Sequence, residues 1–362
     1  MKRVWTTIAG ATALLTAALA PLSAAAQPGE FYAGKTLTII VNLAAGGTVD
    51  TFVRSFVPYL KKHIPGDPNI VVQNMPGAGG LLATNYLMEK AARDGLTITY
   101  GPWDPLAQAL GNQGLRARYE QFEYLGGTSD IRVNYARTDS IPGGLKKPAD
   151  IAKAKDIAVG ALNNTDISGL VAHLSLNVLG VPHKFVTGYR GGQDIFLAMQ
   201  RGEIQLHNTS IGTFRTRSGN FIKSGEGMGI AYLVVVNKDG SFERNKLITE
   251  MPAFPELYKE VYGKMPSGPD FDALNWLIQQ FGDLAFVGLA PPDTPPQALA
   301  ALRKGFEGAV NDPAFAEWAL KRNGIPYEFV TVERGKAVFK SLAEVSPQVL
   351  TTVKATIEAA GK

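Results

Sequence analysis

The sequence contains no cysteine, which excludes disulfide bonds, thiolate metal sites, cysteine nucleophiles and a lipid-modified amino-terminal cysteine. Histidine is also scarce. The four histidines, at positions 63, 173, 183 and 207, show no spacing typical of metal ligands. No G-x-S-x-G or H-E-x-x-H motif occurs, and the carboxylates form no evident acid/base pair. We therefore predict no metal site and no cofactor, and enzymatic chemistry has little support.

Charge of either sign is limited. Charged residues make up 19% of the chain, the formal net charge is +4, and dense basic runs are absent. This balance does not favour nucleic-acid binding. Long hydrophobic runs are missing as well. The uncharged run 8–20 is too short to span a bilayer, because a membrane helix needs about 20 residues.

That short run lies within a pattern typical of a secretory signal. Lys2 and Arg3 precede it, and the small residues 24–26 follow it. We expect residues 1–26 to be a signal peptide, with cleavage between Ala26 and Gln27. The mature chain is then expected to be soluble and periplasmic, without a lipid anchor.

The remaining chain is long enough for two domains. In its first part, the apolar segments 37–41, 70–72 and 96–100 predict strands, and helices are expected between them. Such alternation indicates an α/β fold with an open parallel sheet, where ligands bind beyond the carboxyl ends of the strands. Three loops, at Gly46, Gly79 and Trp103, are expected at that edge.

A second α/β unit is predicted after an extended crossing segment at 124–136. Its expected strands are 156–160, 183–186 and 203–206, followed by 230–236. Ser168 is the expected cap of the first helix of this unit. Further along, a strand is expected at 281–289, helices after Thr294 and Asp312, and a helical tail over 333–360.

The stretch 37–64 combines a strand, a glycine turn and a helix. Its helix carries apolar residues at helical spacing and is capped by either Thr48 or Asp50. A helix amino terminus after Gly46-Gly47 can bind an anion, and a positive φ is expected at Gly47. Two interpretations stay open: the turn holds one end of a small carboxylate, or it is an ordinary tight turn.

Two matches to nucleotide-binding motifs are rejected. Residues 29–36 fit G-x-x-x-x-G-K-T, but that motif must follow a strand and open a helix, and here it opens a strand. Residues 77–80 resemble a dinucleotide loop, but Leu82 replaces its third glycine.

Several polar or aromatic residues follow predicted strands. Arg190 can pair with a ligand carboxylate or lie on the surface bonded to carbonyls. Trp103 can form an apolar wall for a ligand or belong to the core. For Asp104, a helix cap before Pro105 is favoured over an amine contact. The loop 163–165 offers neutral hydrogen bonds, or simply turn chemistry.

These stretches together resemble the Bug family, the periplasmic receptors of tripartite tricarboxylate transporters. The blocks that carry the resemblance cover nearly the whole mature chain and include 41–50, Val72-Gln73-Asn74-Met75-Pro76-Gly77-Ala78-Gly79-Gly80, Asp94-Gly95, Gly188-Tyr189-Arg190-Gly191-Gly192, 289–295 and Asp312-Pro313. The block at 72–80 is the most specific, and the order of the blocks is more specific than any single one.

The resemblance implies a two-lobed, type II periplasmic-binding-protein-like fold with the ligand cleft between the lobes. The expected division assigns 27–128 and 238–362 to the first lobe and 129–237 to the second. The chain departs from the family pattern at Asn163-Asn164-Thr165, at Trp103-Asp104 and in an extra stretch near 264–275.

The residue patterns and the resemblance together give one predicted set of ligand-binding residues: Ala45, Gly46, Gly47, Thr48, Asp50, Trp103, Asp104, Asn163, Asn164, Thr165, Tyr189, Arg190, Gly191, His207 and Asn208. The expected function is a monomeric receptor that captures a small di- or tricarboxylate, or an aromatic acid, for transporter membrane subunits. The alternatives are a hydrolase-type enzyme on the same fold and a ligand-reporting subunit of a membrane sensor.

Overall fold

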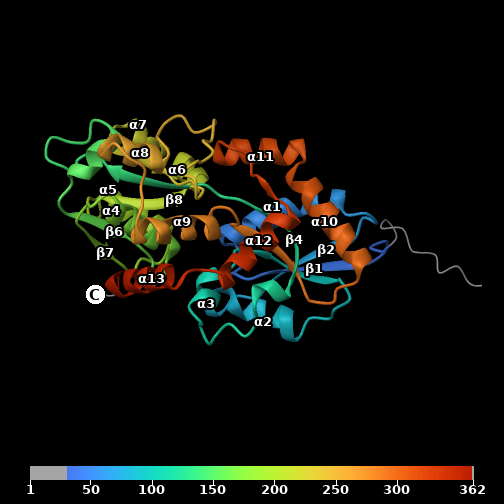
Figure 1. The fold of residues 1–362 in the computed structure, drawn as a ribbon. Helices are drawn as coiled ribbons and strands as arrows, with labels where there is room; N and C mark the ends of the chain where they lie inside the picture. Colours follow the sequence, from blue (N-terminus) through green and yellow to red (C-terminus); the bar gives the residue numbers. More distant parts are fainter. Residues whose placement is uncertain (1–30, 361–362) are drawn as a thin grey trace, which may run out of the picture.

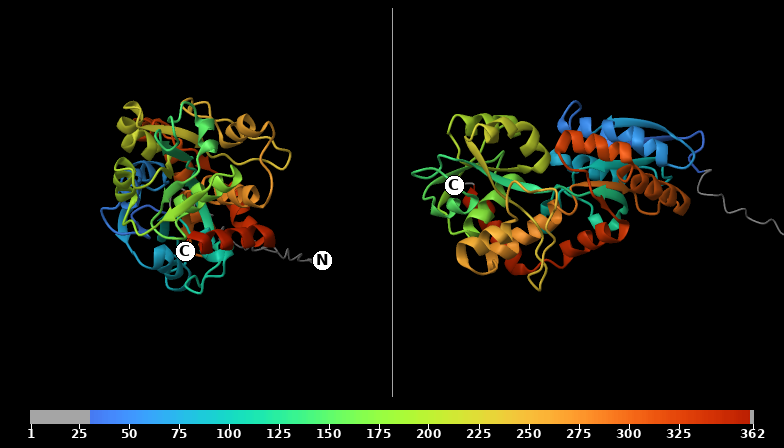
Figure 2. Two further views of the ribbon diagram at one scale, coloured as in Figure 1. Left: turned by 90° about the vertical axis from the view of Figure 1, so that its left-hand side faces the viewer. Right: turned by 90° about the horizontal axis from the view of Figure 1, so that it is seen from above.

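The computed structural model describes residues 31–360, so the predicted signal peptide and its cleavage site lie outside the described residues. The described chain forms two α/β lobes, each built around one sheet (Figure 1). The chain first passes from one sheet to the other at residues 129–131, and Figure 2 shows the lobes lying end to end. No helix among residues 31–360 is both long enough and apolar enough to cross a membrane.

The first sheet has six strands in the order β11-β4-β10-β3-β1-β2. Strand β1 pairs in parallel with β2 and β3, as predicted, whereas β10 runs antiparallel to β3 and β4. The strands are β1 (Thr36–Val41), β2 (Asn69–Asn74), β3 (Thr97–Gly101), β4 (Glu123–Thr128), β10 (Phe286–Ala290) and β11 (Phe329–Val330). Strand β1 lies inside the sheet because its run of β-branched residues suits a strand buried on both faces.

Helices on the first sheet bury one apolar stripe each. In α1, Phe52, Val53, Phe56 and Leu60 face the core and pack against α10. Full burial of such a side chain contributes about 1.5–3 kcal/mol. The helical elements of this lobe are α1 (Thr48–His63), η1 (Ala78–Gly80), α2 (Leu81–Glu89), α3 (Pro105–Ala109), η2 (Tyr119–Gln121), α10 (Pro296–Val310), α11 (Pro313–Asn323) and α12 (Val332–Ala343).

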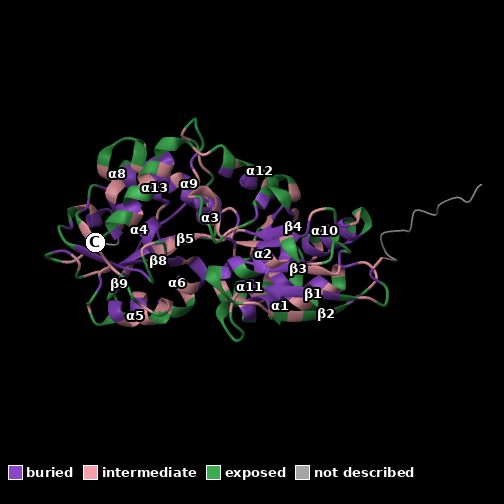
Figure 3. Cartoon of the chain, turned by 90° about the horizontal axis from the view of Figure 1, so that it is seen from below, coloured by how far each residue is buried: buried purple, intermediate pink, exposed green. Residues whose placement is uncertain are grey.

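The second sheet has five strands in the order β7-β6-β8-β5-β9. Its elements are β5 (Arg132–Arg137), η3 (Pro148–Lys153), β6 (Ile157–Gly160), α4 (Ile167–Val178), β7 (His183–Val186), α5 (Gly192–Gln200), β8 (Leu206–Ser210), α6 (Ile211–Arg217), α7 (Gly219–Lys223) and β9 (Gly227–Tyr232). In Figure 3 the central strands of both sheets are mostly buried, and the outward faces of the surrounding helices are exposed; the edge strands β2 and β7 contain no buried residue.

Two expected strands of the second lobe were misplaced. Residues 203–206 were expected to form a strand, but the strand is β8, at 206–210. The chain after α5 first makes a turn, in which the N–H groups of Gly202 and Glu203 bond carbonyls of α5. The predicted strand 230–236 is β9, which begins at Gly227 and ends at Tyr232.

The carboxy-terminal part of the chain contributes to both lobes. Residues 238–362 were expected in the first lobe, yet α8 (Phe254–Tyr262), α9 (Pro269–Phe281) and α13 (Pro347–Ala360) pack on elements of the second. Burial of apolar side chains explains this packing, because Leu274, Leu277 and Ile278 of α9 are buried in a hydrophobic cluster that includes residues of α4. The expected strand at 281–289 therefore begins only at Phe286, and part of the 264–275 stretch opens α9.

Two helix starts also differ from the prediction. Asp166, not Ser168, caps α4, and its side chain accepts from the Ser168 N–H. Helix α1 begins after Gly47, which supplies no side-chain cap, so neither Thr48 nor Asp50 is the cap. The predicted helical tail is confirmed and consists of two helices, α12 and α13.

Candidate ligand-binding site between the lobes

Two cavities flank the segment where the chain crosses between the lobes. Residues Ser129–Ile131 line both, and the cavity volumes are about 520 and 570 Å³. Both volumes fall within the range of about 300–1,000 Å³ that is usual for small-molecule sites. The first cavity is bounded by the start of α1 in one lobe and the start of α6 in the other. The second cavity is also lined from both lobes, but only the first is bordered by a helix start from each lobe, so it is the better candidate for an anionic ligand.

The lining of the first cavity is rich in hydroxyl groups and cations. The hydroxyls belong to Thr48, Ser129, Ser210, Thr213 and Thr216, the cations to Arg217, Lys321 and Arg322, the carboxylates to Asp130 and Glu328, and the aromatic rings to Phe52, Phe286 and Tyr327. Hydroxyls and cations are groups that hold a carboxylate. The lining is thus suited to an anionic ligand with an apolar or aromatic part.

The three cations of this cavity differ in whether their charge has a partner. Lys321 pairs with Glu317 at 2.7 Å, and Arg322 lies over the Trp318 ring at 5.5 Å. Arg217 has no ion-pair or hydrogen-bond partner within residues 31–360. Its Nη1 atom lies 3.1 Å from the position that a Cβ at Gly192 would occupy, so the guanidinium sits beside the start of α5. Sequence reasoning missed Arg217, because nothing local marks the last residue of α6.

The glycine turn before α1 is exposed from Ala45 to Thr48, and Thr48 lines the first cavity. Within the described chain, no acceptor is assigned to the N–H groups of Thr48 and Val49. The positive φ of the turn, 76°, is at Gly46, whereas Gly47 is extended at −71°, which corrects the expectation for Gly47. Free N–H groups at a helix start are donors that an anion can accept from.

Asp50 holds this turn in place. Its carboxylate accepts hydrogen bonds from Gly46 N at 2.8 Å, Arg54 Nε at 2.9 Å and Asn74 Nδ2 at 2.9 Å. These bonds, led by Arg54, lower the pKa of Asp50 to about 2. The buried carboxylate is therefore ionised, and it accepts its hydrogen bonds from residues of the first lobe.

The loop before α5 carries three predicted residues, Tyr189, Arg190 and Gly191. The Arg190 side chain is 91% exposed and pairs with Asp194 at 3.2 Å. Tyr189 is half-buried, and burial raises the pKa of its hydroxyl. Gly191 precedes α5 in an extended conformation, so it does not need the freedom of glycine. None of the three lines either interlobe cavity.

The loop 163–165 shows turn chemistry. Asn163 Oδ1 accepts from the backbone N of Thr165 at 2.9 Å and from its hydroxyl at 2.8 Å. Asn163 and Thr165 are exposed, and Asn164 is half-buried. These groups lie at the carboxyl end of β6, the edge where a ligand was expected, but outside the two cavities.

His207 and Asn208 lie inside β8 rather than in a loop after a strand. His207 is 5% exposed, and burial, aided by the Arg132 charge, lowers its pKa to about 3. The fully buried Asn208 accepts from Arg132 Nε at 2.9 Å and donates to Asn134 Oδ1 at 2.9 Å. Both residues therefore belong to the interior of the second sheet.

Trp103 and Asp104 belong to the interior of the first lobe. Trp103 is buried, donates to the Leu284 carbonyl at 2.7 Å and packs edge-on against Tyr119. Asp104 caps α3 by accepting from Ala107 N at 2.9 Å, which was the favoured interpretation. Burial raises the pKa of Asp104. Of the whole predicted set, Thr48 alone lines either interlobe cavity.

Asp130 and Arg132, at the crossing, are further candidates that sequence reasoning missed. Asp130 lines both cavities, and burial raises its pKa to about 6 although the Arg132 charge opposes the shift. Among residues 31–360, the Arg132 side chain donates hydrogen bonds to the neutral side chains of Asn208 and Ser168, and burial lowers the pKa of Arg132. The two charges close together at the predicted crossing segment were a signal that could have marked the site.

No protein-family model matches the chain, and no curated protein matches it in sequence. Solved structures do match. The periplasmic binding protein BugD is 21% identical over 91% of this chain and 99% of its own, with a TM-score of 0.59. A TctC solute-binding protein from Polaromonas is 18% identical over 90% of this chain and 99% of its own, with a TM-score of 0.63.

A third match is MatC from Rhodopseudomonas palustris with bound malate. It is 19% identical over 90% of this chain and 99% of its own, with a TM-score of 0.56. These likenesses, each spanning nearly the whole of the compared chain, show that the fold is that of Bug and TctC periplasmic binding proteins. The predicted two-lobed fold is thereby confirmed.

Proposed function

We propose that this protein is a periplasmic receptor that captures a small carboxylate between its lobes. The observation that carries the proposal is the first cavity, where the unpaired Arg217 of one lobe and the free start of α1 in the other line the same space. The fold supports the same role, because malate is bound in MatC and adipate in another R. palustris protein of this fold.

The two sides of the cavity contribute different donors. The α1 start offers the N–H groups of Thr48 and Val49 and the positive end of a 16-residue helix. Arg217 offers a guanidinium, which can bind a carboxylate with two parallel hydrogen bonds. A ligand held by both would draw the lobes together, since each lobe alone supplies only half of the donors. We therefore assign the carboxylate contacts to these two positions.

The rest of the lining suggests the ligand class. Phe52 and Phe286 pack with their rings tilted by 49° and their centroids 4.4 Å apart, and the Tyr327 ring centroid lies 5.1 Å from that of Phe52. Together they form an aromatic wall beside the hydroxyls of the cavity. This wall favours a ligand with an apolar middle, such as a dicarboxylate with a methylene chain or an aromatic acid, over a compact tricarboxylate.

The cellular role follows from the same proposal. A signal peptide over residues 1–26 would export the chain, and the monomeric receptor would deliver its ligand to the membrane subunits of a tripartite tricarboxylate transporter. We propose the crossing at 129–131 as the first lobe boundary. Helices α10 and α12 pack on the first sheet again, while α13 packs on the second lobe, so the later part of the chain crosses between the lobes more than once.

A thermal-shift screen of mono-, di-, tricarboxylic and aromatic acids tests the proposal. A ligand present at 100 times its dissociation constant adds about 2.7 kcal/mol of stability, so at least one acid should clearly raise the melting temperature. Mass spectrometry after incubation should recover that acid unchanged, as a receptor requires. A flat response across the panel would count against carboxylate binding, and a converted acid would indicate an enzyme.

A further inference from the structure

Two of the four histidines meet on the surface of the second lobe, away from both interlobe cavities. His173 belongs to α4, and His183 is the first residue of the edge strand β7. The His183 Nε2 atom lies 2.8 Å from His173 Nδ1. Both residues are partly exposed, so solutes reach them.

The two rings do not point straight at each other. Their centroids are 4.4 Å apart, while the two facing nitrogens are 2.8 Å apart. The difference between these distances is less than two imidazole radii, so the two rings are not in line with each other. The interplanar angle is 74°. In the metal-free protein the two facing nitrogens form a hydrogen bond, and a metal ion that displaces its proton would meet both nitrogens side by side.

The outer nitrogen of His183 already has a fixed partner. His183 Nδ1 lies 2.7 Å from the Val181 carbonyl oxygen, so it carries the proton and donates it there. This leaves the lone pair on His183 Nε2, facing His173. A backbone carbonyl behind a histidine is the usual device that orients a metal-binding imidazole. Burial also lowers the pKa of both histidines, which keeps the rings neutral near pH 7.

We propose that His173 Nδ1 and His183 Nε2 together bind one divalent late first-row transition-metal ion, with Cu(II) preferred. Metal–nitrogen bonds of about 2.0–2.1 Å at a right angle separate the two nitrogens by about 2.9 Å, whereas a tetrahedral angle needs about 3.4 Å. The observed 2.8 Å matches the right angle. Right-angled nitrogen donors select Cu(II) or Ni(II), and Cu(II) binds nitrogen sites more tightly.

The site would be open on its other sides. Residues 31–360 contain no group of three or more histidine, cysteine, aspartate or glutamate side chains arranged to hold a metal, so water would complete the coordination. Metal binding displaces the proton shared by the pair, which moves to His173 Nε2 or to solvent. Because β7 is an edge strand, the metal would also tie this strand to α4.

Calorimetric titration of the tag-free exported protein with CuCl₂, together with electron paramagnetic resonance, tests the site. We expect one equivalent of Cu(II) with hyperfine coupling to two nitrogens, and at least tenfold weaker binding in H173Q and in H183Q. The matched control is H63Q, since His63 pairs with Asp312 in the other lobe; it should bind like the parent. Circular dichroism checks that each variant folds. If H183Q does not fold, H173Q alone tests the site, because glutamine is compatible with a helix.

Two results would overturn the proposal. One is a parent protein that binds Cu(II) no more tightly than the double variant H173Q/H183Q, which keeps the amino terminus and every other donor. The other is a bound copper whose spectrum lacks imidazole nitrogens. Carboxylate binding in the cleft is not involved, so either result leaves the proposed receptor function untouched.

Discussion

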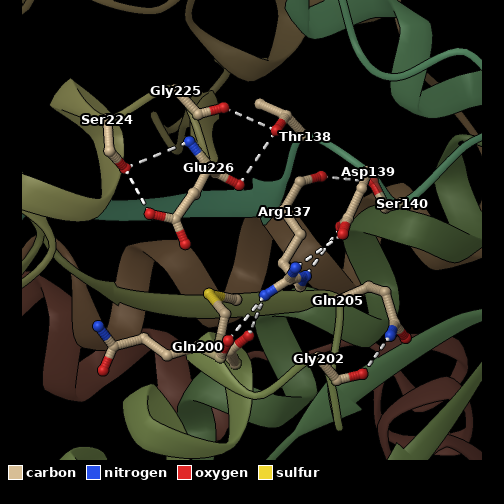
Figure 4. A network of polar contacts seen from close by, with 11 residues as sticks. Arg137, Thr138, Asp139, Ser140, Gln200, Gly202, Gln205, Ser224, Gly225 and Glu226 are labelled. Atoms are coloured by element: carbon tan, nitrogen blue, oxygen red, sulfur yellow. Dashed lines mark hydrogen bonds and ion pairs between the residues drawn. The ribbon is translucent and has the colours of Figure 1, made fainter.

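Helix α5 has an arginine at each end, and the two ends differ sharply. At its carboxyl end, the Arg137 Nη1 donates to the carbonyls of Met199 and Gln200 at 2.7 and 3.1 Å (Figure 4). The same guanidinium bonds both oxygens of Asp139, at 2.8 and 2.7 Å. At the amino end, Arg217 lies beside Gly192 with neither an ion pair nor a hydrogen bond among residues 31–360.

The helix dipole explains why these two ends should behave differently. A cation is stabilised at the carboxyl end of a helix and disfavoured at the amino end. Arg137 is therefore in a favourable and fully bonded position, whereas Arg217 is in an unfavourable one. An anion placed beside Arg217 would satisfy both the guanidinium and the helix start. On our proposal, the arginine at the carboxyl end of α5 serves stability and the one at the amino end serves ligand binding.

Removal of Arg137 should produce the largest effect on stability. The Arg137 side chain is only 15% exposed. R137A removes the hydrogen-bond donor from two helix carbonyls and from the Asp139 carboxylate. Hydrogen bonds to charged groups contribute about 1.5–3 kcal/mol, so we expect a loss of about 2–3 kcal/mol in the free energy of unfolding. Urea denaturation measures it. R201A, which removes an exposed pair with Glu203, should cost under about 0.5 kcal/mol.

Removal of Arg217 should affect binding instead. R217A deletes a charge-assisted contact of about 1.5–3 kcal/mol, which corresponds to roughly ten- to hundredfold in affinity for a carboxylate found in the screen. Its free energy of unfolding should change by less than about 0.5 kcal/mol. R190A is the matched control, because Arg190 is exposed and outside the cavity. Calorimetry that ranks R190A as the more damaging variant would return the ligand to the loop before α5.

Two aspartates, Asp139 beside Arg137 and Asp130 in the interlobe cavity, also differ. Hydrogen bonds from Arg137 lower the pKa of Asp139, whereas burial raises the pKa of Asp130 in the interlobe cavity to about 6. A carboxyl with a raised pKa binds its proton more tightly in the folded state, so its contribution to stability is lost as the pH rises through about 6.

We expect the parent to lose about 1–2 kcal/mol of stability between pH 4 and pH 7 relative to D130N, less than the full shift implies because Asp130 is partly exposed. Denaturation of both proteins across this range gives the difference. Protonation also removes a negative charge from the cavity, so carboxylates should bind the parent more tightly at pH 5.5 than at pH 7.5. Parallel pH curves for the two proteins would show that Asp130 is not perturbed.

The smallest expected effect concerns the glycine turn before α1. Gly46 has a φ of 76°, and the position that a Cβ would occupy there is open space, so G46A should cost about 1 kcal/mol through backbone strain alone. Gly47 is extended, and a Cβ there would meet the Ala44 carbonyl at 3.2 Å. G47A should therefore be the milder change for the backbone. Thermal denaturation that reverses this order would contradict the assigned turn.

Local elements were predictable where local chemistry decides them. A short run of strand-forming residues predicted β7, and Pro and Asp residues predicted the starts of α10 and α11. The structure confirms all three. Arg217 was not predictable, because only tertiary packing brings the end of α6 beside Gly192. Burial of His207 and Asn208 was missed for a similar reason: Arg132, far away in sequence, supplies the partner that lets a polar strand enter the interior.

A crystal structure of the protein with the most stabilising carboxylate of the screen tests the central claim most directly. Our account predicts one carboxylate group in the first cavity, within hydrogen-bonding distance of the Arg217 guanidinium and of the N–H groups at the start of α1. A ligand bound between the 163–165 and 187–191 loops, or in the second cavity, with Arg217 still free, would contradict it.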